Sequence, residues 1–284
     1  MFETNLSDVF GLKIYPVISK NLFQMMIYVP IHHLKLPNGL FQKKSNRVKS
    51  KEMPFLDHLE ELRWRIIKSI LGIIVGAIIT FVFINQIFEL LMLPTSKIEN
   101  LSFQALTPYA MFMLKWGIAL VGGLVIAFPV LTYQIWKFVT PGLLENERKY
   151  VYPVIIFTFI TFFSGVLFAY FVIIPFTLQF FASITVPDVQ NNFSINSYVS
   201  YVLWILLAAG ILFELPVLVL ILSAIGLVTP PFMRHYRRHS ILFFVILSAF
   251  ITPPDPISLL LMTVPLILLY EISIFISKIF SRKI

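Results

Sequence analysis

Residues 55–91 read FLDHLEELRWRIIKSILGIIVGAIITFVFINQIFELL, and this stretch decides the fold. A helix needs about 20 mostly apolar residues to cross a hydrocarbon core about 30 Å thick. The apolar run Ile66–Leu91 is long enough, so we predict that it spans a membrane. Just before it, residues 57–65 hold three carboxylates and two arginines. Cytoplasmic mouths of membrane helices usually carry Lys and Arg, so this acidic cluster needs an explanation.

The rest of the chain repeats the apolar pattern. Hydrophobic residues make up 58% of it and charged residues 13%, and the mean hydropathy is +0.87, as in polytopic membrane proteins. The further predicted spans are Met111–Ile135, Tyr152–Leu178, Tyr198–Ile225, Ser240–Ile251 and Ile257–Ile276. The fifth run is only 12 residues long. It can cross the membrane only if the bilayer is thinned locally or if flanking residues extend the helix. We predict an all-α protein of six transmembrane helices, with the last two short and joined by a Pro-rich turn.

The positions of the basic residues predict the orientation. Six crossings place 20 of the 22 Lys and Arg residues on one side, and only Lys97 and Lys115 on the other. Basic residues are retained on the cytoplasmic side, so both termini are predicted to be cytoplasmic or stromal. The net charge of +8 then reflects topology, which disfavours nucleic-acid binding. Residues 1–52 are predicted to be a poorly ordered basic extension and 53–284 to be the membrane domain.

The chain lacks the usual signatures of catalysis and metal binding. It has no cysteine, no His-Glu-x-x-His, no Gly-x-Ser-x-Gly and no Gly-rich phosphate loop. Its five histidines all lie outside the predicted spans, which argues against a metal site within the membrane. We therefore expect no enzyme, no metal and no cofactor.

The acidic cluster has two interpretations. Pro54, Asp57 and Glu60 fit the start of a helix, and Glu61 pairs with Arg65 at a spacing of four residues. Alternatively, carboxylates at the mouth of a membrane helix form a site for a cationic ligand. Spacing alone leaves these two interpretations equal.

A second polar cluster, residues 138–149, lies between the second and third spans on the same predicted side. We expect Thr140 to cap a short helix that begins at Pro141. A solvated turn at the membrane surface explains the cluster as well as a binding site does. If the cluster binds a ligand, it and the first cluster can line one acidic surface.

Glu214 lies well inside the fourth span, where a carboxylate is costly and usually functional. A structural hydrogen bond to a neighbouring helix is the alternative. Glu271 is predicted to be a packing or snorkelling group. Structural turns are predicted at Pro94, Pro216 and Asp255.

Four ordered motifs make the chain resemble the TatC family, the receptor subunit of the twin-arginine protein translocase. They are FLDHLEELR at 55–63, FxxPGLxxxER at 138–148, FELP at 213–216 and TPPD at 252–255. The family often has Ser-Gln after the last motif, whereas Leu259 follows Ser258 here. By motif position, the resemblance implies a signal-peptide site formed by Glu61, Arg63, Arg65, Phe138, Pro141, Leu143, Glu147 and Arg148. It also implies that Glu214 faces a concave surface where partner subunits dock.

The resemblance further implies a function. The chain would bind twin-arginine signal peptides of folded precursors and assemble with itself and with single-span TatA/TatB-type subunits, in transport driven by the proton gradient. The alternative is a proton-coupled small-solute permease that uses Glu214. The 29 Phe residues, and 14 Lys against 8 Arg, fit an AT-rich organellar genome. A plastid thylakoid membrane is therefore expected ahead of a bacterial inner membrane.

Overall fold

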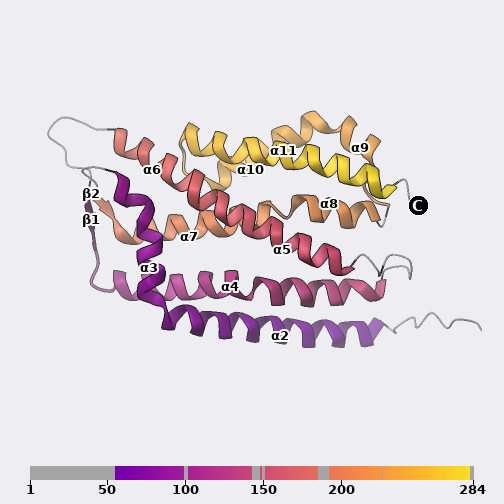
Figure 1. Cartoon of the computed structure of the whole chain (residues 1–284), viewed down its shortest axis with the longest axis horizontal. Coiled ribbons are helices and arrows are strands. Elements are labelled where there is room, and N and C mark those ends of the chain that lie inside the picture. The colour runs from indigo at the N-terminus through magenta and orange to yellow at the C-terminus, as the bar shows by residue number, and fades with distance from the viewer. Residues whose placement is uncertain are drawn as a thin grey trace, which may run out of the picture. The chain divides into compact units, whose positions relative to one another are not determined.

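The computed structural model describes residues 55–98, 102–142, 148, 151–184, 192–224 and 226–281. The chain divides into two units after Glu52, and the second unit, Met53–Ile284, is described here. The extension predicted for 1–52 lies outside the described residues. The second unit is built almost entirely of helices (Figure 1). In chain order these helices are α2 Phe55–Val82, α3 Ile84–Met92, α4 Ala110–Val139, α5 Val151–Phe168, α6 Ile174–Ser183, α7 Ile195–Leu212, α8 Leu215–Ala224, α9 Pro230–His235, α10 Arg237–Ile251 and α11 Pro256–Ser281.

Within the described part of the chain, five helical stretches are long and apolar enough to cross a membrane. They are His58–Val82, Ala110–Val139, Val151–Ser183, Ile195–Ser223 and Pro256–Lys278. Each overlaps a predicted span, which confirms an all-α polytopic membrane protein. The third stretch joins α5 and α6 through a π-helical turn at Ala169–Ile173, and the fourth joins α7 and α8.

The last two helices differ from each other in length. The predicted short span lies in α10, which has 15 residues, so the sixth crossing and the side of the termini stay predictions. α11 has 26 residues, so the expectation that both last helices are short is wrong for α11. Residues 277–281 contain neither Pro nor Gly, so nothing in them breaks the helix after the apolar run ends.

The first apolar run is not one straight helix. α2 ends at Val82, and α3 begins at Ile84 and turns away to cross the start of α4 (Figure 1). The C-terminal carbonyls of α3 have no partner within the helix. Tyr170 donates to the Leu90 carbonyl at 2.7 Å, and Tyr198 donates to the Leu91 carbonyl at 2.6 Å. These bonds tie the end of α3 to the third and fourth spans.

Two three-residue strands lie at the same end of the unit as α3. β1 Ser102–Gln104 pairs in parallel with β2 Asn192–Ser194, with Phe103 opposite Phe193. This pairing could not be predicted, because three residues are too few to show a period-two pattern. The pairing joins the segment after α3 to the segment before α7.

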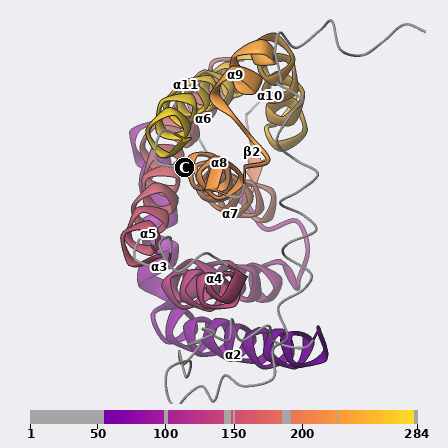
Figure 2. The same cartoon turned by 90° about the vertical axis from the view of Figure 1, so that its right-hand side faces the viewer.

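Viewed along the helices, α2, α4, α5 and α11 follow a curved row, and α7–α8 lie inside the curve (Figure 2). α7 and α8 lie end to end (Figure 1), and because α7 contacts α4 and α5 while α8 contacts α11, this central broken helix holds the row together. Four fully buried side chains from different helical segments meet in its core: Ile118, Ile173, Val202 and Met262.

α2 and α4 run antiparallel and approach each other through glycines. A Cβ added to Gly76 would lie 2.4 Å from the Gly123 carbonyl oxygen, and one added to Gly123 would lie 2.4 Å from the Ala77 nitrogen. Helices in lipid associate through small residues, because lipid supplies no hydrophobic force to drive apolar helices together. The two backbones therefore touch only because neither position carries a side chain.

We expect Gly123→Ala to destabilise the protein by roughly 1–3 kcal/mol, because the new methyl meets backbone atoms that cannot yield. Thermal unfolding of the purified chain in detergent measures this change. Gly117→Ala on the same helix is the control, since its Cβ would meet only Leu203 Cδ1 at 3.6 Å. Both changes gain the same helix propensity, so equal unfolding temperatures would contradict the close contact.

Candidate functional site

The start of α2 and the end of α4 meet through an aromatic stack. The His58 and Phe138 rings lie 4.3 Å apart between centroids, with 13° between their planes. These residues belong to the two polar clusters that the sequence set apart. The stack therefore brings the two clusters side by side, a contact that spacing along one helix could not reveal.

Beside this stack, Glu61 and Arg65 form an ion pair one turn apart on α2. His58 Nδ1 lies 3.9 Å from the second Glu61 oxygen, Oε2. Arg65 is 9% exposed, so its guanidinium is largely shielded from solvent. We call His58, Glu61, Arg65 and Phe138 the charged site.

The charged site is only partly satisfied by its own hydrogen bonds. Glu61 Oε2 and Arg65 Nε are both buried, and neither has a hydrogen-bond partner among the described residues. An unpaired buried carboxylate oxygen loses its hydration without compensation. The interpretation of Glu61 and Arg65 as a pair within α2 is therefore correct but incomplete, because one carboxylate oxygen still lacks a donor.

Some other residues of the predicted signal-peptide site are exposed or half-buried, and the rest lie outside the described residues. Arg63 and Arg148 are exposed, and Pro141 is half-buried in the 3-10 turn Thr140–Gly142 that follows α4. Leu143 and Glu147 lie outside the described residues. The structure therefore shows only the α2 side and the α4 end of the predicted site.

The prediction for Thr140 is wrong. Its backbone is helical, it ends α4, and its hydroxyl donates back to the Trp136 carbonyl at 2.6 Å. An N-cap residue needs an extended backbone and a hydroxyl that accepts from the following turn. Here the hydroxyl instead adds a second hydrogen bond to the Trp136 carbonyl, which also accepts from the backbone N–H of Thr140.

Glu214 lies at the two-residue break between α7 and α8, and Pro216 follows two residues later in the first turn of α8. The Thr161 hydroxyl on α5 lies 3.1 Å from Glu214 Oε1. Glu214 Oε2 is buried and has no partner within the described part of the chain. Thr161 could not be singled out among the threonines of the third span, because the contact joins residues 53 positions apart.

The remaining polar positions are structural. Pro94 lies in the 3-10 turn Leu93–Lys97 after α3. Asp255 is 4% exposed and accepts from the Ser258 amide at 2.7 Å and from the Ser258 hydroxyl, so it caps the start of α11. Glu271 pairs with Arg237 of α10 at 2.8 Å instead of snorkelling. No group of three metal-ligating side chains occurs among the described residues.

These features define a polytopic, all-helical integral membrane protein whose distinctive chemistry is a charged site at one end of its helices. The sequence model of the Sec-independent protein translocase protein TatC matches residues 57–265. The chain belongs to the TatC family, whose members are components of a protein translocase.

Relatives from distant bacteria agree over most of the chain. The TatC protein of Desulforapulum autotrophicum is 36% identical over 234 residues, which cover 81% of this chain and 86% of that protein. The TatC protein of Aquifex aeolicus is also 36% identical over 234 residues, covering 81% and 97%. A crystal structure of the twin-arginine translocase receptor TatC superimposes with a TM-score of 0.70 at 35% identity, covering 79% of this chain and 99% of that one.

We expect Asp255→Ala to cost roughly 0.5–2 kcal/mol of stability, because the first turn of α11 loses its side-chain acceptor. Thermal unfolding in detergent measures the loss. Asp255→Asn keeps one acceptor oxygen and is expected to lose less. Unfolding of the Ala variant at the wild-type temperature would contradict the capping role.

Proposed function

We propose that this chain is the receptor subunit that binds twin-arginine signal peptides of folded precursor proteins. The observation that carries the proposal is the buried Glu61 Oε2 at the junction of α2 and α4, which has no hydrogen-bond partner among the residues that the structure describes. A guanidinium group is planar and presents paired N–H donors, which match a carboxylate better than any other side chain does. A cationic peptide group would supply the donor that Glu61 lacks.

Two arginines need two acceptors, and the second in this proposal is Glu147. Arg65 holds the first oxygen of Glu61 and leaves Oε2 for the ligand, so Arg65 positions the carboxylate. The stack of His58 on Phe138 forms the surface next to the Glu61 carboxylate. Arg63, Pro141, Leu143 and Arg148 would shape the rest of the site.

We further propose that Glu214 is a docking point for single-span TatA/TatB-type subunits. Its second oxygen is buried, without a hydrogen-bond partner in the described ranges, where the helix is broken between α7 and α8. A polar group of a partner helix would satisfy this oxygen, since hydrogen bonds between helices stabilise association in lipid. Transport would draw on the proton gradient, in complexes that also contain further copies of this chain.

For the location we propose a plastid thylakoid membrane, with a bacterial inner membrane as the alternative. The support is compositional: 29 Phe, and 14 Lys against 8 Arg. The relatives quoted above are bacterial, which keeps the alternative open.

We expect Glu61→Ala combined with Glu147→Ala to reduce photocrosslinking of a twin-arginine precursor by at least about tenfold, since each lost charge-assisted bond costs about 1.5–3 kcal/mol. The photoreactive group is placed beside the arginines of the signal peptide, and membrane insertion of the chain is checked in parallel. Glu60→Ala combined with Glu145→Ala removes the same charge and is the control.

The same assay separates guanidinium recognition from simple charge attraction. A precursor with two lysines in place of the arginines should crosslink weakly to the wild-type chain, because an ammonium lacks the planar fork. Normal crosslinking of the arginine precursor to the Glu61/Glu147 double variant would refute the proposed site.

We expect Glu214→Ala to retain precursor crosslinking but to lose co-purification of single-span subunits. Glu271→Ala is the control, because Glu271 is exposed and paired with Arg237. Solute uptake by the purified chain alone that is lost in Glu214→Gln would instead support the permease and reject the docking role.

A further inference from the structure

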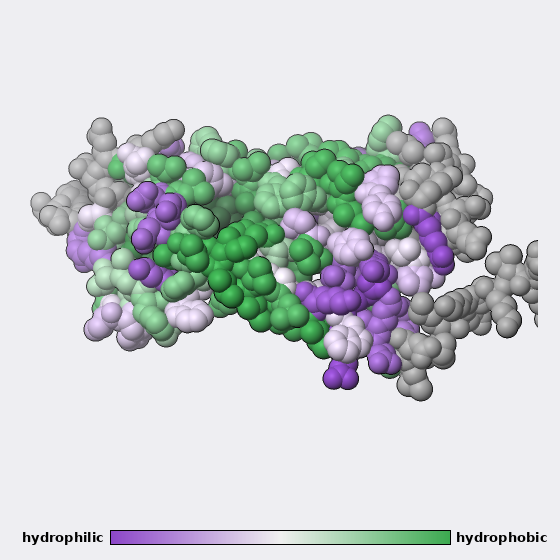
Figure 3. Space-filling view, turned by 60° about the horizontal axis from the view of Figure 1, so that its bottom comes forward, coloured by the Kyte–Doolittle hydropathy of each residue, from purple (hydrophilic) through white to green (hydrophobic). Residues whose placement is uncertain are grey.

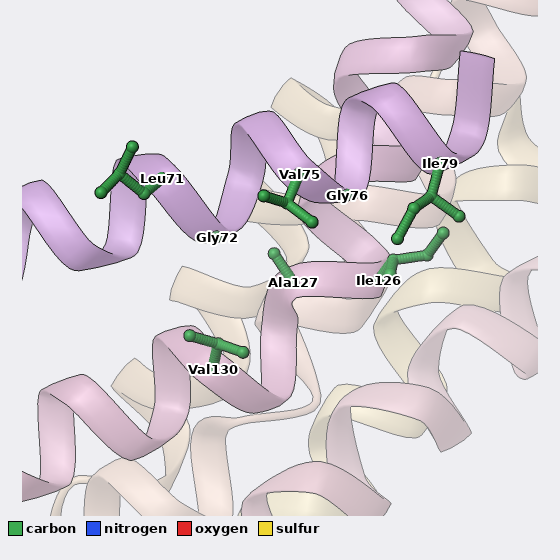
Figure 4. A pocket seen from close by; sticks show the side chains of 8 residues that line it. All are labelled: Leu71, Gly72, Val75, Gly76, Ile79, Ile126, Ala127 and Val130. Carbon is green, nitrogen blue, oxygen red and sulfur yellow. The ribbon is translucent and has the colours of Figure 1, made fainter. Parts of the chain in front are cut away.

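An open groove of about 310 Å³ runs along the outer face of the α2–α4 pair (Figure 4). Its lining is entirely apolar: Leu71, Gly72, Val75, Gly76, Ile79, Ile126, Ala127 and Val130. The lining residues of α2 extend over two turns, or about 12 Å along the axis. The groove belongs to neither the charged site nor the break at Glu214.

The groove exists because the contact of α2 with α4 is made by residues without large side chains. At Gly72 an added Cβ would lie 3.3 Å from Val130 Cγ1, so the floor of the groove is helix backbone and Val130. Leu71 and Val75 stand beside this floor and are each 55% exposed. In a membrane such an apolar channel is filled by hydrocarbon, either lipid or another helix.

Two lysines lie at one end of this groove. Lys68 precedes Leu71 and Gly72 by three and four residues, so it shares their face of α2. Lys137 follows Val130 by seven residues, or about two turns, on the matching face of α4. Because the helices are antiparallel and Gly72 lies against Val130, both lysines extend beyond the same end. Figure 3 shows hydrophilic side chains gathered there, beside a continuous apolar band.

The surroundings of these lysines favour an anion at the membrane surface. Both lysines are exposed, and within the described ranges neither forms an ion pair. The Lys137 ammonium lies 5.7 Å from the centroid of the Tyr133 ring, and Trp64, one turn before Lys68, is 53% exposed. Tyr and Trp with exposed bodies are typical of the level of lipid headgroups.

We infer that the α2–α4 groove is a binding site for one anionic phospholipid. An acyl chain lies in the apolar groove, and the phosphate lies between Lys68 and Lys137. Basic positions between membrane helices recognise anionic headgroups in this way. The site is independent of signal-peptide recognition.

Charge decides between a lipid and the other candidate occupants. A twin-arginine peptide segment running along the groove would have to pass two ammonium groups of its own sign. A zwitterionic lipid carries its own cation beside the phosphate and would gain less from the lysines, and an apolar partner helix would gain nothing. An anionic phospholipid fits both the apolar channel and its positive end best.

The test uses the full-length chain in nanodiscs of phosphatidylcholine with a minor share of phosphatidylglycerol. After release into mild detergent, native mass spectrometry counts the retained lipid. We expect phosphatidylglycerol to be strongly enriched over phosphatidylcholine. Lys68→Gln with Lys137→Gln should lower its retention on the order of tenfold or more, whereas the Lys→Arg pair should preserve it.

A second variant tests the groove itself. Val75→Phe fills the channel and should also lower retention, whereas Ile74→Phe, an equally exposed position outside the lining, should not. Lys115→Gln, near the other end of α4, is the charge control. Equal retention of the two lipids, or full retention by the Lys68/Lys137 Gln pair, would refute the inference. So would capture of a peptide or a second chain, in place of lipid, by a photocrosslinker at position 75.

Discussion

The close approach of α2 and α4 at Gly76 and Gly123 is the contact on which the charged chemistry of this protein depends. It sets the register of two antiparallel helices. With that register, His58 at the start of α2 lies on Phe138 near the end of α4, although 80 residues separate them. The same contact leaves room for the groove, because glycines form its floor. The charged site and the groove therefore both depend on the same packing contact between two helices.

Polar groups inside the bundle follow from the absence of water in the hydrocarbon core, where each unsatisfied group costs several kcal/mol. Most find a local solution: tyrosine hydroxyls bond the end of α3, and Asp255 caps α11. Glu61 and Glu214 are different, since each keeps one buried carboxylate oxygen without a partner among the described residues. One lies at the end of the helices and the other at a helix break. These are the places where a ligand or a partner helix gains most by binding.

The sequence predicted what depends on local pattern. Long apolar runs yielded the five spans, and the spacing of Glu61 and Arg65 yielded their ion pair. It could not predict contacts that arise only after helices pack, such as His58 on Phe138 or Thr161 near Glu214. It also missed the break at Phe83, where neither Pro nor Gly marks the end of α2. The Thr-Pro pair at Thr140 can stand at the start of a helix or just after the end of one. In the structure α4 extends up to it, so Thr140 ends that helix.

The order of charges along α2 explains how carboxylates can be accommodated at the start of a membrane helix. Glu61 comes first, then Arg65 one turn later, then Lys68 at the start of the groove, all on one side of the helix. Arg65 bonds one of the two oxygens of Glu61 and lies between the carboxylate and the lysine along the helix. A cationic group is therefore attracted only at the outer end, and an anionic headgroup only at the level of the membrane surface. Under the two proposals, a peptide and a lipid occupy successive positions on one helix face, and each is repelled by the charge at the position of the other.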